Sequence, residues 1–198
     1  MAAENYEQVH PETREEWRAW LDANHATSPG VWVVSWKKST GRPSIGYDAL
    51  VEEALCFGWV DSLPRSLDAE RSMNLLTPRK PTSRWSRVNK QRVESLLARG
   101  LMTPAGVAVV EQAKANGAWT ALDAVEELEV PDDLQQAFDD APGSFEQWLA
   151  FPRSVKRAIL EWILDARSDA TRAKRVHETA EKAARGERAN QWRQPKGR

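Results

Sequence analysis

Two short segments of the chain combine residue types that could bind or transform a charged ligand. The segment FGWVDS places the carboxylate of Asp61 two residues after the indole of Trp59, and the segment PRKPTSRWS places the guanidinium of Arg79 ahead of the indole of Trp85. Indoles line many small-molecule sites, and fixed guanidiniums bind carboxylates and phosphates. The two segments therefore predict one site for an anionic or zwitterionic ligand or a peptide. Its candidate ligand-binding residues are Trp59, Asp61, Arg79, Arg84, Trp85 and Asn89.

The carboxylate of Asp61 also allows a catalytic hypothesis. An aspartate in an aromatic segment could be desolvated, which would raise its pKa and suit acid or base work, whereas an ion pair with arginine would lower the pKa. A hydrogen-bonded structural aspartate explains the same pattern. The sequence contains no glycine-rich phosphate loop, no GxSxG elbow and no HExxH motif. No catalytic residue is assigned, and an enzyme with Asp61 as acid or base remains an alternative to a non-enzymatic protein.

The basic side chains around Trp85 allow a third hypothesis. Residues 75–92 contain six basic side chains and no acidic one. Arginine and lysine neutralise phosphates, and a tryptophan can stack on a base. A single indole is not the aromatic platform of a single-strand binder, however, and Trp85 could instead anchor the helix that follows it. Nucleic-acid binding through the basic 79–92 stretch is kept as an alternative.

The charges of the 198-residue chain are grouped, although they sum to only -1. Residues 71–92 contain seven basic and no acidic side chains, whereas residues 115–152 contain nine acidic and no basic ones. Blocks of this kind indicate internal pairing or solvated faces before they indicate a partner. The near-neutral total excludes a protein that acts mainly as a polycation.

Residues that hold metals or disulfides are sparse. Cys56 is the only cysteine and lies at an apolar helix end, which favours a place in the core. His10, His25 and His177 lack partners at ligand spacing, so neither a metal site nor a cofactor is predicted. The first residues lack the layout of a secretory signal and no apolar run could span a membrane, so a cytoplasmic location is expected.

The elements that would position the site combine helices with short strands. Thr13 and Glu16 fit a capping box for a helix that ends near Asn24. Residues 31–39 are β-branched and aromatic, which predicts a strand, and the segments that flank residues 68–70 predict a hairpin. The fold class is therefore α+β, with a small antiparallel sheet of about three strands packed with helices.

Helical patterns dominate from Ser86 onward. Ser86 or Ser83 could cap a helix, Pro104 suits the first turn of another, and Ser144 with Gln147 fits a second capping box. The predicted organisation is an α+β domain over residues 1–116 with the FGWVD and TPRKPTSRWS motifs, an acidic linker or helix over 117–130, a C-terminal helical unit over 131–186 and a flexible tail over 187–198.

The motifs, taken in order, are similar to those of a known family. EEALCFGWVDS, LLTPRKPTSRWSRVNK and RGLMTPAG precede VPDDLQQAF, FPRSVKRAILEWILDARSDATRAKRV and a closing ARGER. Over about residues 10–190 they resemble the YdeI/OmpD-associated family, also called bacteriocin-protection proteins. The resemblance implies a small bacterial protein without an assigned reaction, linked by its name to a porin, to antimicrobial-peptide protection and hence to envelope stress. It supplies no catalytic residue.

The leading hypothesis is a non-enzymatic bacterial binding protein whose site forms where the FGWVD turn meets the PRKPTSRWS segment. Its ligand would be a small molecule or a peptide, and its C-terminal helices could hold a protein partner. One departure from the family pattern concerns the strand before TPR, where this chain has MNLL instead of an aromatic and basic approach. That strand is therefore not expected to add aromatic contacts to a ligand.

Overall fold

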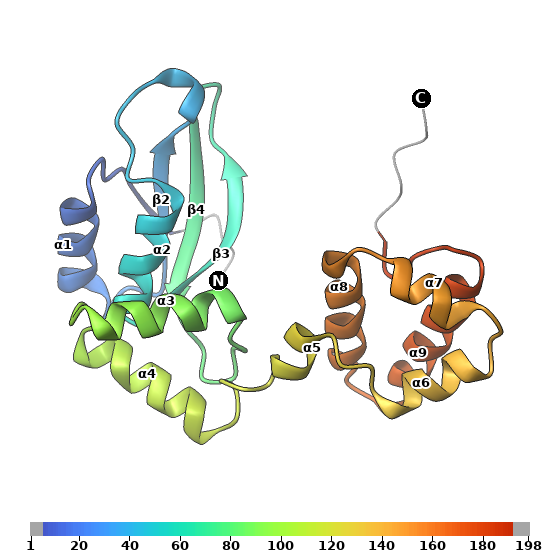
Figure 1. Cartoon of the computed structure of the whole chain (residues 1–198). Coiled ribbons are helices and arrows are strands. Elements are labelled where there is room, and N and C mark those ends of the chain that lie inside the picture. The colour runs from blue at the N-terminus through green and yellow to red at the C-terminus, as the bar shows by residue number, and fades with distance from the viewer. Residues whose placement is uncertain (1–5, 192–198) are drawn as a thin grey trace. The chain divides into compact units, whose positions relative to one another are not determined.

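The computed structural model describes residues 6–191, which fold as two compact units divided after Ala121 (Figure 1). Unit 1, up to Ala121, contains a sheet and helices, and unit 2, from Leu122, contains helices. The expected α+β class is confirmed. Within the described residues, no helix is both long and apolar enough to cross a membrane.

The sheet of unit 1 has four strands rather than the expected three. Its strands are β1 (Glu7–Val9), β2 (Val31–Trp36), β3 (Trp59–Ser66) and β4 (Arg71–Pro78), arranged in the order β1-β2-β4-β3. The predicted hairpin is present as β3 and β4, and β2 pairs antiparallel with β4. The missed strand, β1, pairs parallel with β2, so the sheet is mixed. At three mostly exposed residues, β1 is too short to show an alternating pattern.

The two faces of β2 contact different clusters. Val31 and Val33 pack with the helices of unit 1, whereas Trp32 and Val34 pack with Met73 and other residues on the opposite face. Burial of both faces explains why VWVV is continuously apolar instead of alternating.

Helices of unit 1 bury their apolar sides against the first of these faces. They are α1 (Arg14–Asn24), α2 (Tyr47–Cys56), α3 (Arg87–Ala98) and α4 (Pro104–Ala115), with a 3-10 turn, η2 (Lys38–Thr40), after β2. In Figure 1, α1 and α2 lie beside the sheet, while α3 and α4 follow the hairpin. The shared core includes the fully buried indoles of Trp17, Trp59 and Trp85.

Local signals give the starts of three helices of unit 1 correctly. The hydroxyls of Thr13 and Ser86 accept hydrogen bonds from backbone N–H groups in the first turns of α1 and α3. Pro104 occupies the first turn of α4, as expected. The capping box of α1 is modified, because the carboxylate of Glu16 accepts from the N–H of Glu12 and not from that of Thr13.

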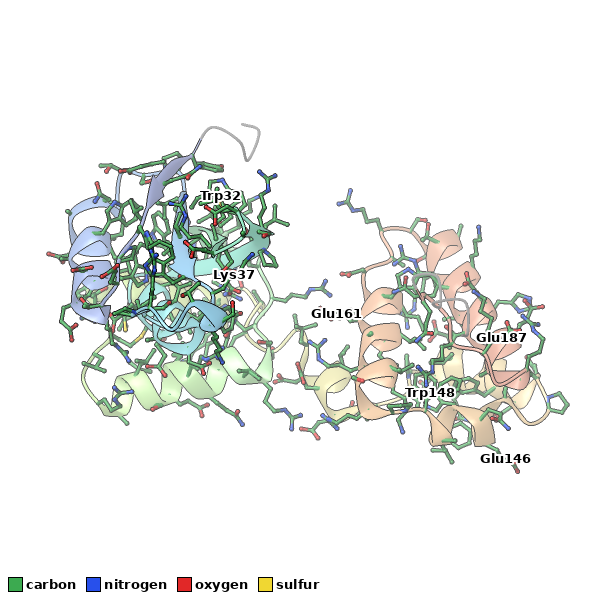
Figure 2. The ribbon with its side chains drawn as sticks, turned by 90° about the horizontal axis from the view of Figure 1, so that it is seen from above. Trp32, Lys37, Glu146, Trp148, Glu161 and Glu187 are labelled. Carbon is green, nitrogen blue, oxygen red and sulfur yellow. The ribbon has the colours of Figure 1, made fainter. Side chains whose placement is uncertain are left out.

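Unit 2 encloses a separate core around Trp148, which Figure 2 labels. Its helices are α5 (Asp123–Glu127), α6 (Asp132–Asp139), α7 (Ser144–Ala150), α8 (Arg153–Leu164) and α9 (Asp169–Ala184). Part of the acidic block is matched inside this unit, since Arg157 binds Glu126 and Arg172 binds Asp133.

Two predictions for unit 2 need correction or completion. The capping box of Ser144 and Gln147 is wrong, because Gly143 precedes α7 without a side-chain cap and the hydroxyl of Ser144 donates to the carbonyl of Phe138. Of the predicted flexible tail, residues 187–191 are placed, and Ala189 is buried in the core of unit 2. Residues 192–198 lie outside the described residues.

A buried carboxylate joins α1 to α2. Glu53 is only 2% exposed, and its two oxygens accept from Arg14 at 2.5 Å and from Arg18 at 2.6 Å. Arg18 also donates to the carbonyl of Leu101, which follows α3. A carboxylate this deep is stable only when it is paired, so the contact fixes α2 relative to its neighbours.

Gly106 allows α4 to approach the end of α2. A methyl group added at this glycine would lie 2.2 Å from the carbonyl oxygen of Cys56 and 2.7 Å from its carbon. The same carbonyl accepts from the N–H and hydroxyl of Thr103. The helix crossing therefore depends on the absence of a side chain at position 106.

Replacing Glu53 by alanine is expected to lower the free energy of unfolding by about 3 kcal/mol, because two arginines lose a buried partner. The matched control is Glu15→Ala, an exposed position on α1, for which a change below about 0.5 kcal/mol is expected. Urea unfolding of both variants measures the difference. Equal losses in the two variants would show that the Glu53 contact contributes nothing special.

Gly106→Ala is expected to destabilise unit 1 by about 3 kcal/mol, since the added methyl group meets backbone atoms that cannot rotate away. At an ordinary helical site the same change stabilises, by up to about 1 kcal/mol. The reverse change at the exposed Ala108 of α4, Ala108→Gly, provides that reference. A thermal unfolding midpoint for Gly106→Ala at or above that of the wild type would contradict the close approach.

Candidate functional site

Asp61 and Tyr47 form the exposed side of the candidate site. Asp61 lies on β3 opposite Leu76, and Tyr47 is the first residue of α2. The Tyr47 hydroxyl donates to Oδ2 of Asp61 at 2.7 Å. This hydrogen bond, with some burial, raises the pKa of Tyr47 to about 12. The phenol is therefore a firm donor at neutral pH, and half of its ring surface stays open, with 53% of the residue exposed.

Arg79 follows β4 and is buried, with 7% of its surface exposed. Its backbone N–H donates to the carbonyl of Gly58, and Nη2 donates to the carbonyl of Arg84 at 2.6 Å. The guanidinium carbon lies 3.7 Å from the ring centroid of Trp85. The other two nitrogens, Nε and Nη1, are buried and have no partner among the described residues.

The electrostatics of Arg79 follow from this burial. Desolvation lowers the pKa of its guanidinium to about 10, and the negative charge of Asp61 opposes that change. Asp61 is therefore close enough to interact with Arg79, although its hydrogen bond goes to Tyr47. The arrangement leaves a buried cation whose charge is only partly compensated.

The two tryptophans of the predicted site are packed inside unit 1. Trp59 and Trp85 are each 1% exposed. The indole N–H of Trp59 donates to the carbonyl of His25, and the ring meets Trp20 edge-on. Trp85 packs against Trp119, and its own indole nitrogen is buried without a partner in the part of the chain that the structure describes. The ring of Trp85 therefore stacks against the guanidinium of Arg79, whereas the ring of Trp59 contacts Trp20 in the same core.

Asn89 connects the start of α3 to α2. Its side-chain oxygen accepts from Arg92, and the second arm of Arg92 donates to Asp48 at 2.6 Å. The positive charge of Arg92 also acts on Tyr47, where it opposes the rise in the pKa of the phenol. Arg84 contributes its backbone carbonyl to Arg79, and its side chain is half-buried.

The structure thus brings three of the six predicted residues, Asp61, Arg79 and Trp85, together with Tyr47 and Arg92, which were not predicted. We call the set of Tyr47, Asp61, Arg79, Trp85 and Arg92 the junction cluster, because it joins α2, β3, the segment after β4 and α3. Sequence reasoning missed Tyr47, since nothing in local spacing links it to a residue fourteen positions away. Within residues 6–191, no three His, Cys, Asp or Glu side chains are grouped as metal ligands.

Comparison with known proteins identifies two segments. Residues 9–109, about half of the chain, match the model of a family described as a domain of unknown function, DUF8412. Residues 127–186 match the model of a family described as bacteriocin-protection, YdeI or OmpD-associated. The expected relationship is therefore confirmed over the C-terminal part. Neither the curated proteins nor the solved structures gave a match.

The hydrogen bond between Tyr47 and Asp61 predicts a late titration of the phenol. In a Tyr6→Phe background, which leaves a single tyrosine, phenolate absorbance is expected to rise with a midpoint near pH 12. Because the bond favours the protonated phenol, its stabilisation is complete below the ordinary pKa of 10.0 and is lost as the pH rises toward 12. Asp61→Asn is expected to move the midpoint back toward 10.0, and an unchanged midpoint would contradict the contact.

Proposed function

Since the chain belongs to the DUF8412 family and carries a bacteriocin-protection, YdeI or OmpD-associated domain after it, we propose that it is a non-enzymatic binding protein of the YdeI/OmpD-associated type. Its ligand is an anionic or zwitterionic small molecule or peptide segment, and the binding site is the junction cluster.

The unpaired guanidinium of Arg79 is the observation that supports this proposal. Replacing buried charges by apolar groups is often neutral or stabilising, so Arg79 is a poor choice for stability alone. Two of its nitrogens lack acceptors, and an arriving carboxylate or similar anion would supply them. The free energy gained on binding is large at a buried guanidinium, because without the ligand its N–H donors stay buried and unpaired.

The neighbouring groups suit the second charge of a zwitterion. Asp61 is half-buried and keeps acceptor positions beyond the one that Tyr47 occupies. The exposed ring of Tyr47 offers a face to a cationic group such as an ammonium. The negative carboxylate of Asp61 and the positive guanidinium of Arg79 are thus near each other, as a ligand with both charges requires.

Binding fits the cluster better than catalysis does. General acid or base work needs a group whose pKa lies near the working pH. The pKa of Tyr47 is raised to about 12 and that of Arg79 is lowered only to about 10, so neither exchanges a proton readily at neutral pH. At neutral pH Tyr47 is therefore a neutral hydrogen-bond donor and Arg79 a fixed positive charge.

The experiment is a titration of tryptophan fluorescence in the full chain, because Trp85 lies directly against Arg79. The probes are acetate, glutamate, a cationic peptide and single-stranded RNA, each at two salt concentrations. The cationic peptide is included because residues 127–186 match a bacteriocin-protection family. Arg79→Met, which can still stack on Trp85, and Asp61→Asn are each expected to weaken glutamate binding about tenfold or more. Glu94→Gln on α3 and Arg99→Gln, directly after α3, are the matched controls.

Stability provides the second readout. Arg79→Met is expected to unfold at the same temperature as the wild type or higher, because it removes a buried charge. A loss of about 3 kcal/mol or more with unchanged glutamate binding would make Arg79 a structural residue and refute the proposal. RNA binding that falls steeply with salt, with no effect of either variant on glutamate, would favour the nucleic-acid alternative.

A further inference from the structure

A pocket of about 580 Å³ lies on unit 1, beside the junction cluster but distinct from it. It is formed by the end of β2, the segment from Lys37 to Gly46, the start of α2 and part of β4. Figure 1 shows this segment crossing from the sheet to α2. None of the six residues predicted from the sequence lines the pocket. Tyr47 is the one residue that the pocket shares with the junction cluster.

The basic side chains that line this pocket are Lys37, Lys38 and Arg42, and no acidic side chain lines it. The ammonium of Lys37, labelled in Figure 2, uses its three donors on the carbonyls of Asp68 at 2.6 Å and Ala69 at 3.3 Å and on the hydroxyl of Ser66, so it contributes charge to the pocket rather than a free donor. These acceptors are neutral, so they fix the position of the ammonium without cancelling its charge.

Arg42 is held in a similar way. Its guanidinium carbon lies 4.2 Å from the ring centroid of Trp36, which fixes the plane of the group. The nearest carboxylate, that of Glu70, is 3.7 Å away, and both side chains are at least half exposed. Such a surface pair contributes little and is easily exchanged for a stronger anion.

The strands contribute polar side chains to the pocket at positions where a structural sheet would be apolar, beside the apolar Trp36 and Leu50. Val31 pairs with Leu76 under the helices, but further along the same face Ser35 pairs with Ser72, and Asn74 lies between these pairs. Among residues 6–191, none forms a hydrogen bond with the side chains of Ser35, Ser72 or Asn74. Their hydroxyl and amide donors therefore face the pocket unused.

The start of α2 adds backbone donors at the rim. Gly46 precedes this ten-residue helix without a side-chain cap, and both Gly46 and Tyr47 line the pocket. The first N–H groups of a helix have no partner within it, and the helix dipole makes this end positive. Here they border a pocket that already gathers cations and free hydroxyls, which is the combination that binds oxyanions.

We propose that this pocket binds a small molecule through a doubly charged oxyanion group, either a phosphate ester or inorganic phosphate. Three cations suit two negative charges better than the single charge of a carboxylate. The volume lies in the range of small-molecule sites and exceeds what a bare phosphate fills, so an organic part has room beside it.

Isothermal titration of the full chain with inorganic phosphate, phenyl phosphate and benzoate tests this assignment. Both phosphates are expected to bind, and benzoate more weakly by about tenfold. Tighter binding of phenyl phosphate identifies an ester as the ligand class, whereas equal affinities identify the free ion. Raising the salt concentration is expected to weaken both phosphates, since the cations are exposed.

Variants locate the bound group. Lys38→Gln and Arg42→Gln change exposed side chains, so the fold is retained, and each is expected to weaken phosphate binding about tenfold, with the double variant weaker still. Lys174→Gln makes the same charge change at an exposed position of α9 and is expected to have no effect. An unchanged affinity in the double variant, an equal loss in Lys174→Gln, or no phosphate binding by the wild type would each overturn the assignment.

The same titration separates this site from the junction cluster. Arg79→Met and Asp61→Asn are expected to bind phosphate as the wild type does, whatever they do to glutamate. Phosphate binding that is lost in Arg79→Met and kept in the double variant would place the anion on Arg79 and overturn the pocket assignment. A loss of glutamate binding alone leaves the pocket intact, so the two proposals fail by different observations.

Discussion

The position of α2 is the constraint on which unit 1 depends. The helix is held along its length, because the indole of Trp17 donates to the carbonyl of Leu50, Glu53 pairs with arginines of α1, and the carbonyl of Cys56 accepts twice from Thr103. These contacts involve buried or half-buried groups, which would cost free energy if they were left unpaired. A helix fixed in this way can present its first residues in a constant position.

Both of the proposed ligand-binding features of unit 1 depend on that position. Tyr47 begins α2 and reaches Asp61, while Gly46 and Tyr47 border the oxyanion pocket. On the sheet side, the pairing of β3 with β4 shifts register between Asp61 and Leu63. A bulge of this kind redirects side chains and is common beside functional sites. The sheet therefore positions one side of the junction cluster and of the pocket, and α2 positions the other side. The packing of α2 near the sheet brings the two sides together.

Local chemistry could be predicted from the sequence, and contacts between distant segments could not. Thr13 and Ser86 act as helix caps because a cap depends on residues three positions away. The strand Glu7–Val9 was missed because its pairing with β2 is decided by the fold and not by its own pattern. Asp61 was selected for its aromatic surroundings, but the partner that defines its chemistry, Tyr47, comes from another element.

The basic composition of the central segment has a different meaning in the folded chain. Arg79 is buried against an indole, and Arg92 is paired with Asp48, so neither is available as an exposed phosphate contact. The exposed Lys38 and Arg42 lie on a shorter segment that lines a pocket, and the run of charges in the sequence does not single this segment out. Since the field at a site depends on charges within about 8 Å at physiological salt, a chain with a net charge near zero can still present a strongly cationic pocket. The capacity to bind anions therefore depends on where the fold exposes its cations and not on the length of a basic run in the sequence.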